Sequence, residues 1–279
     1  ASIMQAIDMI VVLYRRHPQD AETLMTLSQI DFAALGIDAE VHIWDNAREQ
    51  PAPPPADFLR MPWRYCSSAA NEPLSKVYNT LVRASSRPYV AIFDQDSRVD
   101  ARFFRELIEA IETREADVYA PRIMHGDKTI SPGCLKWIKG ASLPGVTGKA
   151  MLPRNFTAMM SGMCMSRALL ARLGPRPFDE RLRLYGVDTR FCRDLSRLGA
   201  RAWITGAQLG HDSALRSTTD PAAILQRQIW LWQSWLRVFD RNPLEMLAIR
   251  GYVLWKAWRV ASAVRARSRF FHVVAEVFR

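Results

Sequence analysis

The first 120 residues alternate between short apolar runs and segments with helical spacing, and this alternation is the strongest constraint on the fold. The apolar runs are rich in β-branched side chains and cover residues 6–16, 39–46 and 88–94. The helical segments cover 18–36, the second half of 67–86, and 100–114. Strand–helix–strand order at this spacing predicts a parallel, doubly wound α/β sheet. Segment 47–62 is too rich in proline for regular structure, and for 120–155 we expect an irregular region or an edge hairpin.

Two carboxylates, Asp94 and Asp96, end the third apolar run with only Gln95 between them. Ligands of open parallel sheets bind beyond the carboxyl ends of the strands, and Asp45, which ends the second run, would face the same crevice. Because side chains two residues apart on an extended chain point to one side, Asp94 and Asp96 can converge on a hard cation. A solvated turn is the alternative, since such a triplet also arises by chance. We expect a Mg²⁺ or Mn²⁺ site that also binds phosphate oxygens.

The composition excludes several other classes of protein. Hydrophobic residues make up 49% of the chain and charged residues 24%, which is ordinary for a globular protein. No apolar run approaches the roughly 18 residues of a membrane-spanning helix, and no basic region precedes the first apolar stretch, as a signal peptide would require. The cysteines (Cys66, Cys134, Cys164 and Cys192) lie far apart without a CxxC pair. We therefore expect buried, reduced thiols and a cytosol-facing chain rather than zinc ligands or disulfides.

The net charge of +10 lies mostly in the last fifth of the chain, where ten bases and three acids follow Asp220. A first helix there, with Trp232 and Trp235 on one stripe, is expected to pack on the rest of the protein. In the segment that follows, Trp255 and Trp258 stand beside Lys and Arg at helical spacing, as is typical of a helix in a membrane interface. A nucleic-acid patch would also be basic, but no recognised binding motif accompanies this one. We expect a membrane surface as partner, and no nucleic acid.

Several motifs, taken in order, resemble the family 2 inverting glycosyltransferases of GT-A fold: VVLY, IWDN, NEPLSKVYN, VAIFDQDS, MSGMCMSRALLARLG and FDERLRLYGVDTRFCRDLSRLG. They span roughly residues 7–216, and FDQDS is most similar to bacterial rhamnosyltransferases. The resemblance implies a Rossmann-like nucleotide-diphospho-sugar transferase fold of the GT-A type, with a mostly parallel sheet flanked by helices, over residues 1–219. It implies a nucleotide-sugar-binding half, 1–120, and an acceptor and catalytic half, 121–219, with 220–279 as a C-terminal helical extension.

The resemblance also implies which residues bind the donor. Asp45 matches the acid that contacts the nucleotide base or ribose, and a capping role at a loop start is its structural alternative. Asn71 and Asn79 flank the segment that lines the nucleotide crevice, although Pro73 stands where the family has Gly and Tyr78 where it has a small residue.

The metal site follows from the same resemblance. Asp94 would hold the ribose or metal-bound water, Gln95 would share the donor-binding loop, and Asp96 would ligate the metal. His211 matches a late family histidine that contacts the metal or the diphosphate, and a purely structural histidine is the alternative. The cation would neutralise the diphosphate leaving group as the glycosidic bond breaks.

Asp188 matches the family's catalytic base, which takes the proton of the acceptor hydroxyl. Phe191 agrees with the family pattern. Tyr185 stands where the family commonly has another acid, and Asp194 where it has a base, although the neighbouring Arg193 could substitute. A plain carboxylate at a helix start is the alternative for Asp188.

These features predict a cytoplasmic, metal-dependent inverting glycosyltransferase that associates peripherally with the inner face of the cell membrane. It would transfer L-rhamnose from dTDP-L-rhamnose to a polysaccharide or lipid-linked acceptor in bacterial surface glycan synthesis. A UDP-sugar is the alternative donor. A non-catalytic scaffold that binds sugar nucleotides or glycans is the alternative from another class, and the departures at Tyr185 and Asp194 keep it open.

Overall fold

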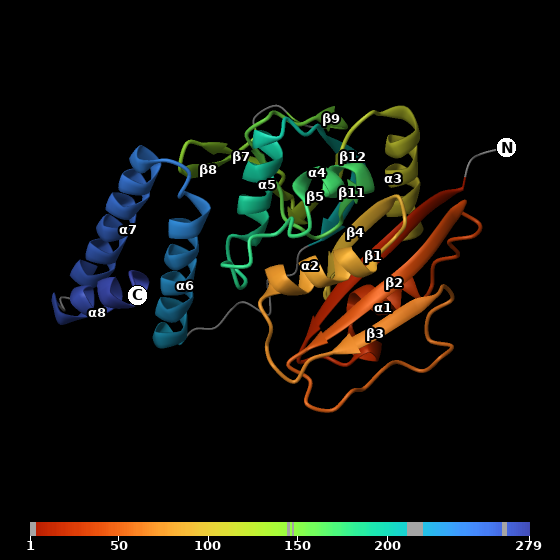
Figure 1. The fold of residues 1–279 in the computed structure, drawn as a ribbon, viewed down its shortest axis with the longest axis horizontal. Helices are drawn as coiled ribbons and strands as arrows, with labels where there is room; N and C mark the ends of the chain where they lie inside the picture. Colours follow the sequence, from red (N-terminus) through yellow and green to blue (C-terminus); the bar gives the residue numbers. More distant parts are fainter. Residues whose placement is uncertain (1–3, 144–145, 147, 211–219, 264–266) are drawn as a thin grey trace.

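A computed structural model describes residues 4–143, 146, 148–210, 220–263 and 267–279, which are built around one large sheet (Figure 1). In spatial order its strands are β3 (Trp63–Ser67), β2 (Ile37–Asn46), β1 (Gln5–Tyr14), β4 (Tyr89–Asp94), β11 (Met163–Ser166), β5 (Val118–His125), β12 (Ala202–Gly210) and β9 (Ala150–Met151), with β6 (Lys128–Ser131) paired to β5. The four strands from β3 to β4 run parallel to one another. The expected α/β fold with a mostly parallel sheet is confirmed.

Helices cover both faces of this sheet. They are α1 (Glu22–Leu27), α2 (Leu74–Ala84), α3 (Ala101–Thr113), α4 (Arg167–Leu173) and α5 (Val187–Arg197). Helices α1 and α3 share one core cluster with Met9 and Val11 of β1, while α2, α4 and α5 share the other with Ile10. Successive side chains of β1 therefore enter opposite cores, as the period of two in a strand requires.

The pairing register brings three strand ends to one edge of the sheet. Strand β1 pairs with β2 so that Leu13 lies beside Asp45, and it pairs with β4 so that Val12 lies beside Asp94. Parallel strands that end in step place their last side chains along one crevice.

Two expectations from the sequence were too coarse. The helix expected over 18–36 is confined to a single 3₁₀ turn, η1 (Pro18–Asp20), and to α1. Segment 120–155 contains the end of β5 and a hairpin of β7 (Gly133–Lys136) and β8 (Lys139–Ser142), which forms a second sheet with β10 (Phe156–Thr157). Strands of two to four residues are too short to show a hydrophobic period.

The basic end of the chain forms a helical unit of α6 (Pro221–Val238), α7 (Pro243–Ala263) and α8 (Arg267–Val277). Trp232 of α6, Val253 of α7 and Val273 of α8 meet in a small core of this unit. Val238 and Phe239, at the end of α6, are buried in the main core instead, so the first helix packs on the rest of the protein as expected. None of the described helices is long and apolar enough to cross a membrane.

Ion pairs attach this unit to α5. Arg190 of α5 bonds to Asp240 at 2.6 Å, and Asp194 accepts a hydrogen bond of 3.0 Å from Arg241. Arg193 pairs with the buried Glu245. Asp194, which departs from the expected family pattern, binds the corner between α6 and α7 in this chain.

Close packing at Gly186 gives a test of this attachment. Gly186, which precedes α5, has φ of +79°, and a Cβ there would lie 2.8 Å from Val238 Cγ2. Gly36 has a similar φ of +71° but open space around it. We expect Gly36→Ala to lose about 1–2 kcal/mol of unfolding free energy from the left-handed backbone alone. Gly186→Ala should lose about 1–3 kcal/mol more from overpacking, as measured by denaturant unfolding. Equal losses in the two variants would contradict the packing at α5.

Candidate functional site

The loop after β4 is held in place by side chains of α1. The hydroxyl of Thr23 donates to the carbonyl of Asp94 and accepts the N–H of Ser97 at 2.9 Å. The N–H of Tyr14, at the end of β1, donates to Gln95 Oε1 at 2.9 Å. Gln95 thus fixes the loop to the neighbouring strand, and the backbone that carries Asp94 and Asp96 is braced from two sides.

A short chain of hydrogen bonds connects this loop to Asp188. Ser97, next to Asp96, lies 2.7 Å from Ser161 between hydroxyl oxygens. The N–H of the adjacent Met160 donates to Asp188 Oδ2 at 3.1 Å. Asp188 lies in the first turn of α5, so residues 160–161 bring the predicted base to the predicted metal loop.

The electrostatics of Tyr78 agree with this proximity. Burial raises the pKa of the Tyr78 hydroxyl well above its usual value, and the negative charges of Asp94 and Asp188 raise it further. The buried Tyr78 hydroxyl on α2 therefore experiences the negative charge of both carboxylates. Their shared negative potential, together with the partly exposed Asp96, fits a divalent cation.

Asp45 is wholly buried, and only one of its two carboxylate oxygens has a hydrogen-bond partner among the described residues. Its Oδ2 accepts hydrogen bonds from Arg48 at 3.0 Å and from the Tyr65 hydroxyl at 2.8 Å. Its Oδ1 and the Nη2 of Arg48 are buried without a hydrogen-bond partner among the described residues. Buried polar atoms are seldom left unpaired, so this pair is ready for a ligand that offers both a donor and an acceptor.

The two predicted asparagines lie in different surroundings. Asn71 is exposed, and its Oδ1 accepts from the Asn46 side chain at 2.9 Å, directly after β2. Asn79 is fully buried in α2, where its amide binds the backbone of Phe178 in both directions and also Glu180. The Asn79 amide therefore holds the segment before α5, and its role in donor binding stays a prediction. His211, the third predicted metal ligand, lies outside the described residues.

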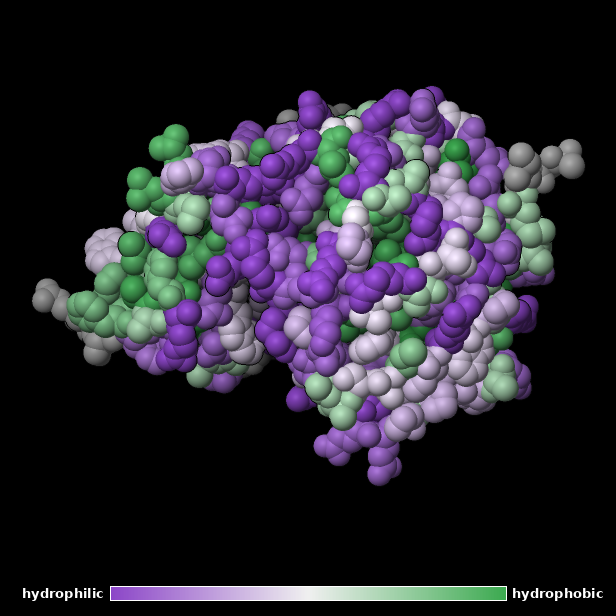
Figure 2. All heavy atoms as spheres, in the orientation of Figure 1, coloured by the Kyte–Doolittle hydropathy of each residue, from purple (hydrophilic) through white to green (hydrophobic). Residues whose placement is uncertain are grey.

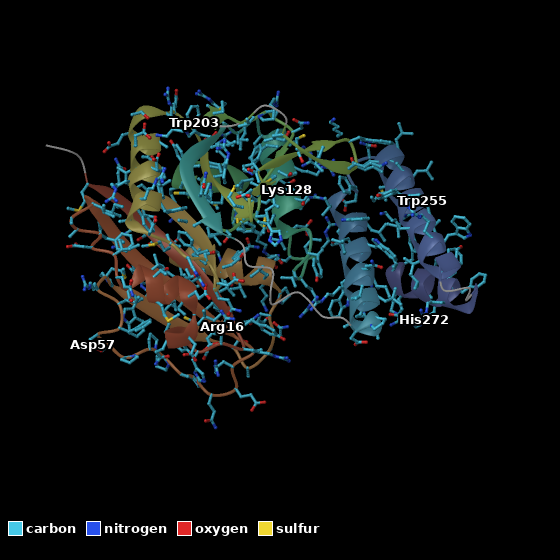
Figure 3. The ribbon with its side chains drawn as sticks, turned by 180° about the vertical axis from the view of Figure 1, so that it is seen from behind. Arg16, Asp57, Lys128, Trp203, Trp255 and His272 are labelled. Carbon is cyan, nitrogen blue, oxygen red and sulfur yellow. The ribbon has the colours of Figure 1, made fainter. Side chains whose placement is uncertain are left out.

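Four further exposed or basic residues near the strand ends and α5 were not singled out from the sequence. Arg15 and Arg16 follow β1 directly, and Figure 3 shows Arg16 at this edge of the sheet. Trp230 of α6 is 51% exposed and Leu184, two residues before Gly186, is 58% exposed. Trp230 lies one turn from Ser234, which packs against Gly186 beside α5. The two arginines could have been found from the sequence, because they form a basic pair directly after an apolar run. Trp230 could not, because its position depends on how α6 packs in the folded protein.

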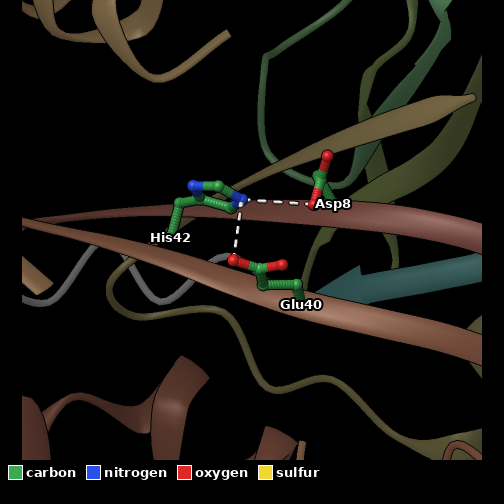
Figure 4. A group of neighbouring side chains, drawn as sticks. All are labelled: Asp8, Glu40 and His42. Carbon is green, nitrogen blue, oxygen red and sulfur yellow. Dashed lines mark hydrogen bonds and ion pairs between the residues drawn. The ribbon is translucent and has the colours of Figure 1, made fainter. Parts of the chain in front are cut away.

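Asp8, Glu40 and His42 form another cluster with metal-ligand types, at the opposite end of β1 and β2 (Figure 4). His42 Nε2 lies 3.1 Å from Asp8 and 3.8 Å from Glu40. Arg87 already binds both carboxylates, at 3.2 Å from Asp8 and 2.6 Å from Glu40, and Arg64 also pairs with Glu40. Because these arginines already neutralise both carboxylates, we interpret the cluster as a structural ion network.

A family model described as glycosyl transferase family 2 matches residues 10–174, more than half of the chain. The chain belongs to glycosyl transferase family 2. The matched region carries Asp45, Asp94 and Asp96, whereas Asp188 lies beyond it. No curated protein sequence matches the chain.

Solved structures share the fold of this family 2 chain at low sequence identity. S. aureus TarS 1–349 in complex with UDP is 13% identical, with a TM-score of 0.55 over 92% of this chain and 72% of that one. The mannosyltransferase PcManGT from Pyrobaculum calidifontis, in complex with GDP-Man and Mn²⁺, is 15% identical, with a TM-score of 0.54 over 96% and 78%. GalNAc-T7 with UDP, GalNAc and Mn²⁺ is 12% identical, with a TM-score of 0.58 over 86% and 48%.

These likenesses show the fold of the family 2 chain, which is of the GT-A type, and not its substrates. The chain spans 41% of a longer TarS chain. Which sugar and which acceptor it uses must therefore be argued from its own residues.

The Asp8 network gives a prediction about stability. Burial by itself would raise the pKa of Asp8, but hydrogen bonds from His42 and from the backbone of Arg87 and Ser86 hold this pKa well below its usual range. A carboxyl with a lowered pKa stabilises the fold above the unfolded pKa of about 4, and this contribution is lost as the pH falls. We expect Asp8→Asn to lose about 3–5 kcal/mol at pH 7, and less at pH 3, in denaturant unfolding.

The control for Asp8→Asn is Asp57→Asn, which changes an exposed acid and should leave stability unchanged. An Asp8→Asn protein that stayed as stable as the wild type but lost Mn²⁺-dependent ligand binding would show that the cluster is a metal site.

Proposed function

We propose that this family 2 chain is a metal-dependent inverting glycosyltransferase whose donor and acceptor meet between the β4 loop and α5. The observation that carries the proposal is the hydrogen-bonded path from Ser97 through Ser161 and Met160 to Asp188. It supports a crevice that has a cation-binding acid pair on one side and a carboxylate base at a helix start on the other.

The donor would bind along the carboxyl edge of the sheet. The unpaired Asp45 Oδ1 suits an N–H of the nucleotide base, and the unpaired Nη2 of Arg48 suits a base carbonyl. Asn71 borders the same edge, and Arg15 and Arg16 supply positive charge near the diphosphate. Asp94 and Asp96 are the residues that would hold Mg²⁺ or Mn²⁺, which would supply positive charge to the departing diphosphate.

The proposed transfer is a single displacement. Asp188 accepts the proton of the acceptor hydroxyl, and the acceptor oxygen forms a bond to the anomeric carbon. The bond from that carbon to the diphosphate oxygen breaks on the opposite face, and its electron pair leaves with the nucleoside diphosphate. The N–H of Met160, 3.1 Å from Asp188 Oδ2, orients the carboxylate for this step.

We infer dTDP-L-rhamnose as the donor from the FDQDS sequence, with a UDP-sugar as the alternative. The acceptor would be a polysaccharide or lipid-linked glycan of a bacterial surface. The exposed Trp230 and Leu184 give its sugar rings apolar surface beside α5. Asp194, whose departure from the family pattern favoured a scaffold, is explained by its bond to Arg241, so an active enzyme is the better-supported function.

Nucleotide binding gives the first test of the donor site. The thermal unfolding midpoint would be measured with dTDP, UDP, GDP and CMP, each with and without Mn²⁺. One nucleotide at about 100 times its Kd should add roughly 2.7 kcal/mol and raise the midpoint by several degrees, only when Mn²⁺ is present. Asp96→Asn should lose this shift, and Asp57→Asn should keep it. Asp188→Asn should also keep the shift but lose sugar transfer.

Two results would count against the donor site. A shift that ignores Mn²⁺ would remove the metal from the proposal, and full transfer activity in Asp188→Asn would remove the base.

We also propose that the helical unit associates with the cytoplasmic face of the membrane. Leu244, Leu247, Leu254 and Trp258 recur along one exposed face of α7, and Leu244 and Leu247 are 74% and 71% exposed. Figure 2 shows apolar side chains gathered over this end of the molecule. Val253 and Ala257 fill the buried face of α7, so this helix carries apolar side chains on an exposed face as well as on its buried face.

Vesicle co-sedimentation tests the membrane association. The double variant Trp255→Ser/Trp258→Ser should bind anionic vesicles about tenfold or more weakly, since each tryptophan withdraws a large apolar area from water. Trp230→Ser removes an equally exposed tryptophan from another face of the unit and should bind as the wild type does. Equal binding by all three proteins would exclude α7 as the contact.

A further inference from the structure

A groove of about 400 Å³ runs between α6 and α7, away from the donor site. Its apolar floor consists of Leu231, Trp232 and Trp235 of α6 together with Val260 of α7. Two cations of α7, Lys256 and Arg259, line the same groove. One concave site thus combines large apolar surface with two positive charges.

Neither cation has a carboxylate partner among the described residues. The acids of the helical unit are used elsewhere: Asp240 and Glu245 pair with arginines of α5, Glu276 pairs with Arg279, and Asp220 accepts the first N–H groups of α6. The positive charge of the groove is therefore not balanced within the helical unit.

Aromatic rings, rather than acids, hold these cations. Lys256 Nζ lies 5.4 Å from the ring centre of Tyr252, and the Arg259 guanidinium lies 5.0 Å from that of Trp255. Tyr252 stacks on Trp255 at 5.7 Å, so the two rings form one platform. Lys139 of the β8 strand lies 5.4 Å from the same Tyr252 ring. Cations held by ring faces keep their N–H donors available to an anion.

We propose that this groove binds the phosphate head of an amphiphile, whose apolar tail continues onto the tryptophan and leucine face of α7. The inference rests on the proposed membrane association and adds a defined headgroup site to it. Phosphate is the anion of choice because guanidinium and ammonium groups together bind its oxygens well. The apolar floor distinguishes the ligand from a free anion, and the exposed Trp255, next to Lys256 in the chain, would take up the tail.

Phosphate heads with apolar tails come from two sources, bilayer phospholipid and isoprenoid diphosphate, and the test separates them. Isothermal titration calorimetry would use farnesyl diphosphate in solution and inorganic diphosphate for comparison. Co-sedimentation would use phosphatidylcholine vesicles with and without phosphatidylglycerol. The groove variant is Lys256→Gln/Arg259→Gln. The matched control, Arg237→Gln/Arg250→Gln, removes the same charge from exposed positions of the same two helices.

The groove variant should bind one of the two amphiphiles about tenfold or more weakly, because it loses charge-assisted hydrogen bonds, while the control stays within about twofold of the wild type. If the groove variant binds farnesyl diphosphate more weakly, the ligand is an isoprenoid diphosphate. If only its binding to vesicles is weaker, the ligand is a phospholipid. Equal loss in both variants on both probes would reduce the effect to general charge and overturn the proposal. The proposal would also be overturned if inorganic diphosphate bound as tightly as farnesyl diphosphate, because the apolar floor would then contribute nothing to binding.

The Mn²⁺-dependent nucleotide shift serves as an internal reference for these variants. Lys256 and Arg259 lie on the helical unit, so both variants should keep that shift. If the shift is absent from the wild type, the proposed donor site has failed. If the wild type binds no vesicles, the membrane association has failed. A groove variant that keeps the shift but binds both amphiphiles like the control would instead mean that the headgroup site alone has failed.

Discussion

The in-step parallel pairing of β1 with β2 and β4 is the constraint on which the rest of the structure depends. It places Asp45 and Asp94 along one edge, and it leaves the loop that follows β4 to be fixed by α1 and by the end of β1. Like charges close together are costly in a folded protein unless something opposes them. At this edge we propose that the opposing charge belongs to a bound cation, whereas at the other end of the same strands arginines balance Asp8 and Glu40 internally.

The two ends of these strands show that similar clusters of potential metal-ligating side chains can have different roles. The Asp8 cluster has a histidine and two carboxylates in good proximity, yet Arg87 reaches both acids. At the other end Asp45 keeps one oxygen without a partner. The bound arginines therefore favour a structural network at Asp8, and the unpaired oxygen of Asp45 favours a ligand site.

Much of the fold could be predicted from the sequence because buried parallel strands are continuous apolar runs, and 88–94 ends where β4 ends. The short strands β7, β8 and β10 could not, since their pairing is decided by contacts distant in sequence. The role of Asn79 was also hidden: its amide binds Phe178, which lies 99 residues further along the chain. The family pattern suggested where Asp188 would lie, but only the turn at Met160 and Ser161 shows how it is brought to the β4 loop.

The corner between α6 and α7 gives the molecule a built-in orientation. Ion pairs of Asp240, Arg241 and Glu245 fix this corner to α5, the helix whose first turn carries Asp188. Any surface on which α7 rests therefore sets the tilt of α5 as well. A change in the charges of this corner would tilt Asp188, the proposed base, relative to that surface without altering a single residue around it. A few arginine–carboxylate contacts would thus set the orientation of α5 relative to a membrane surface.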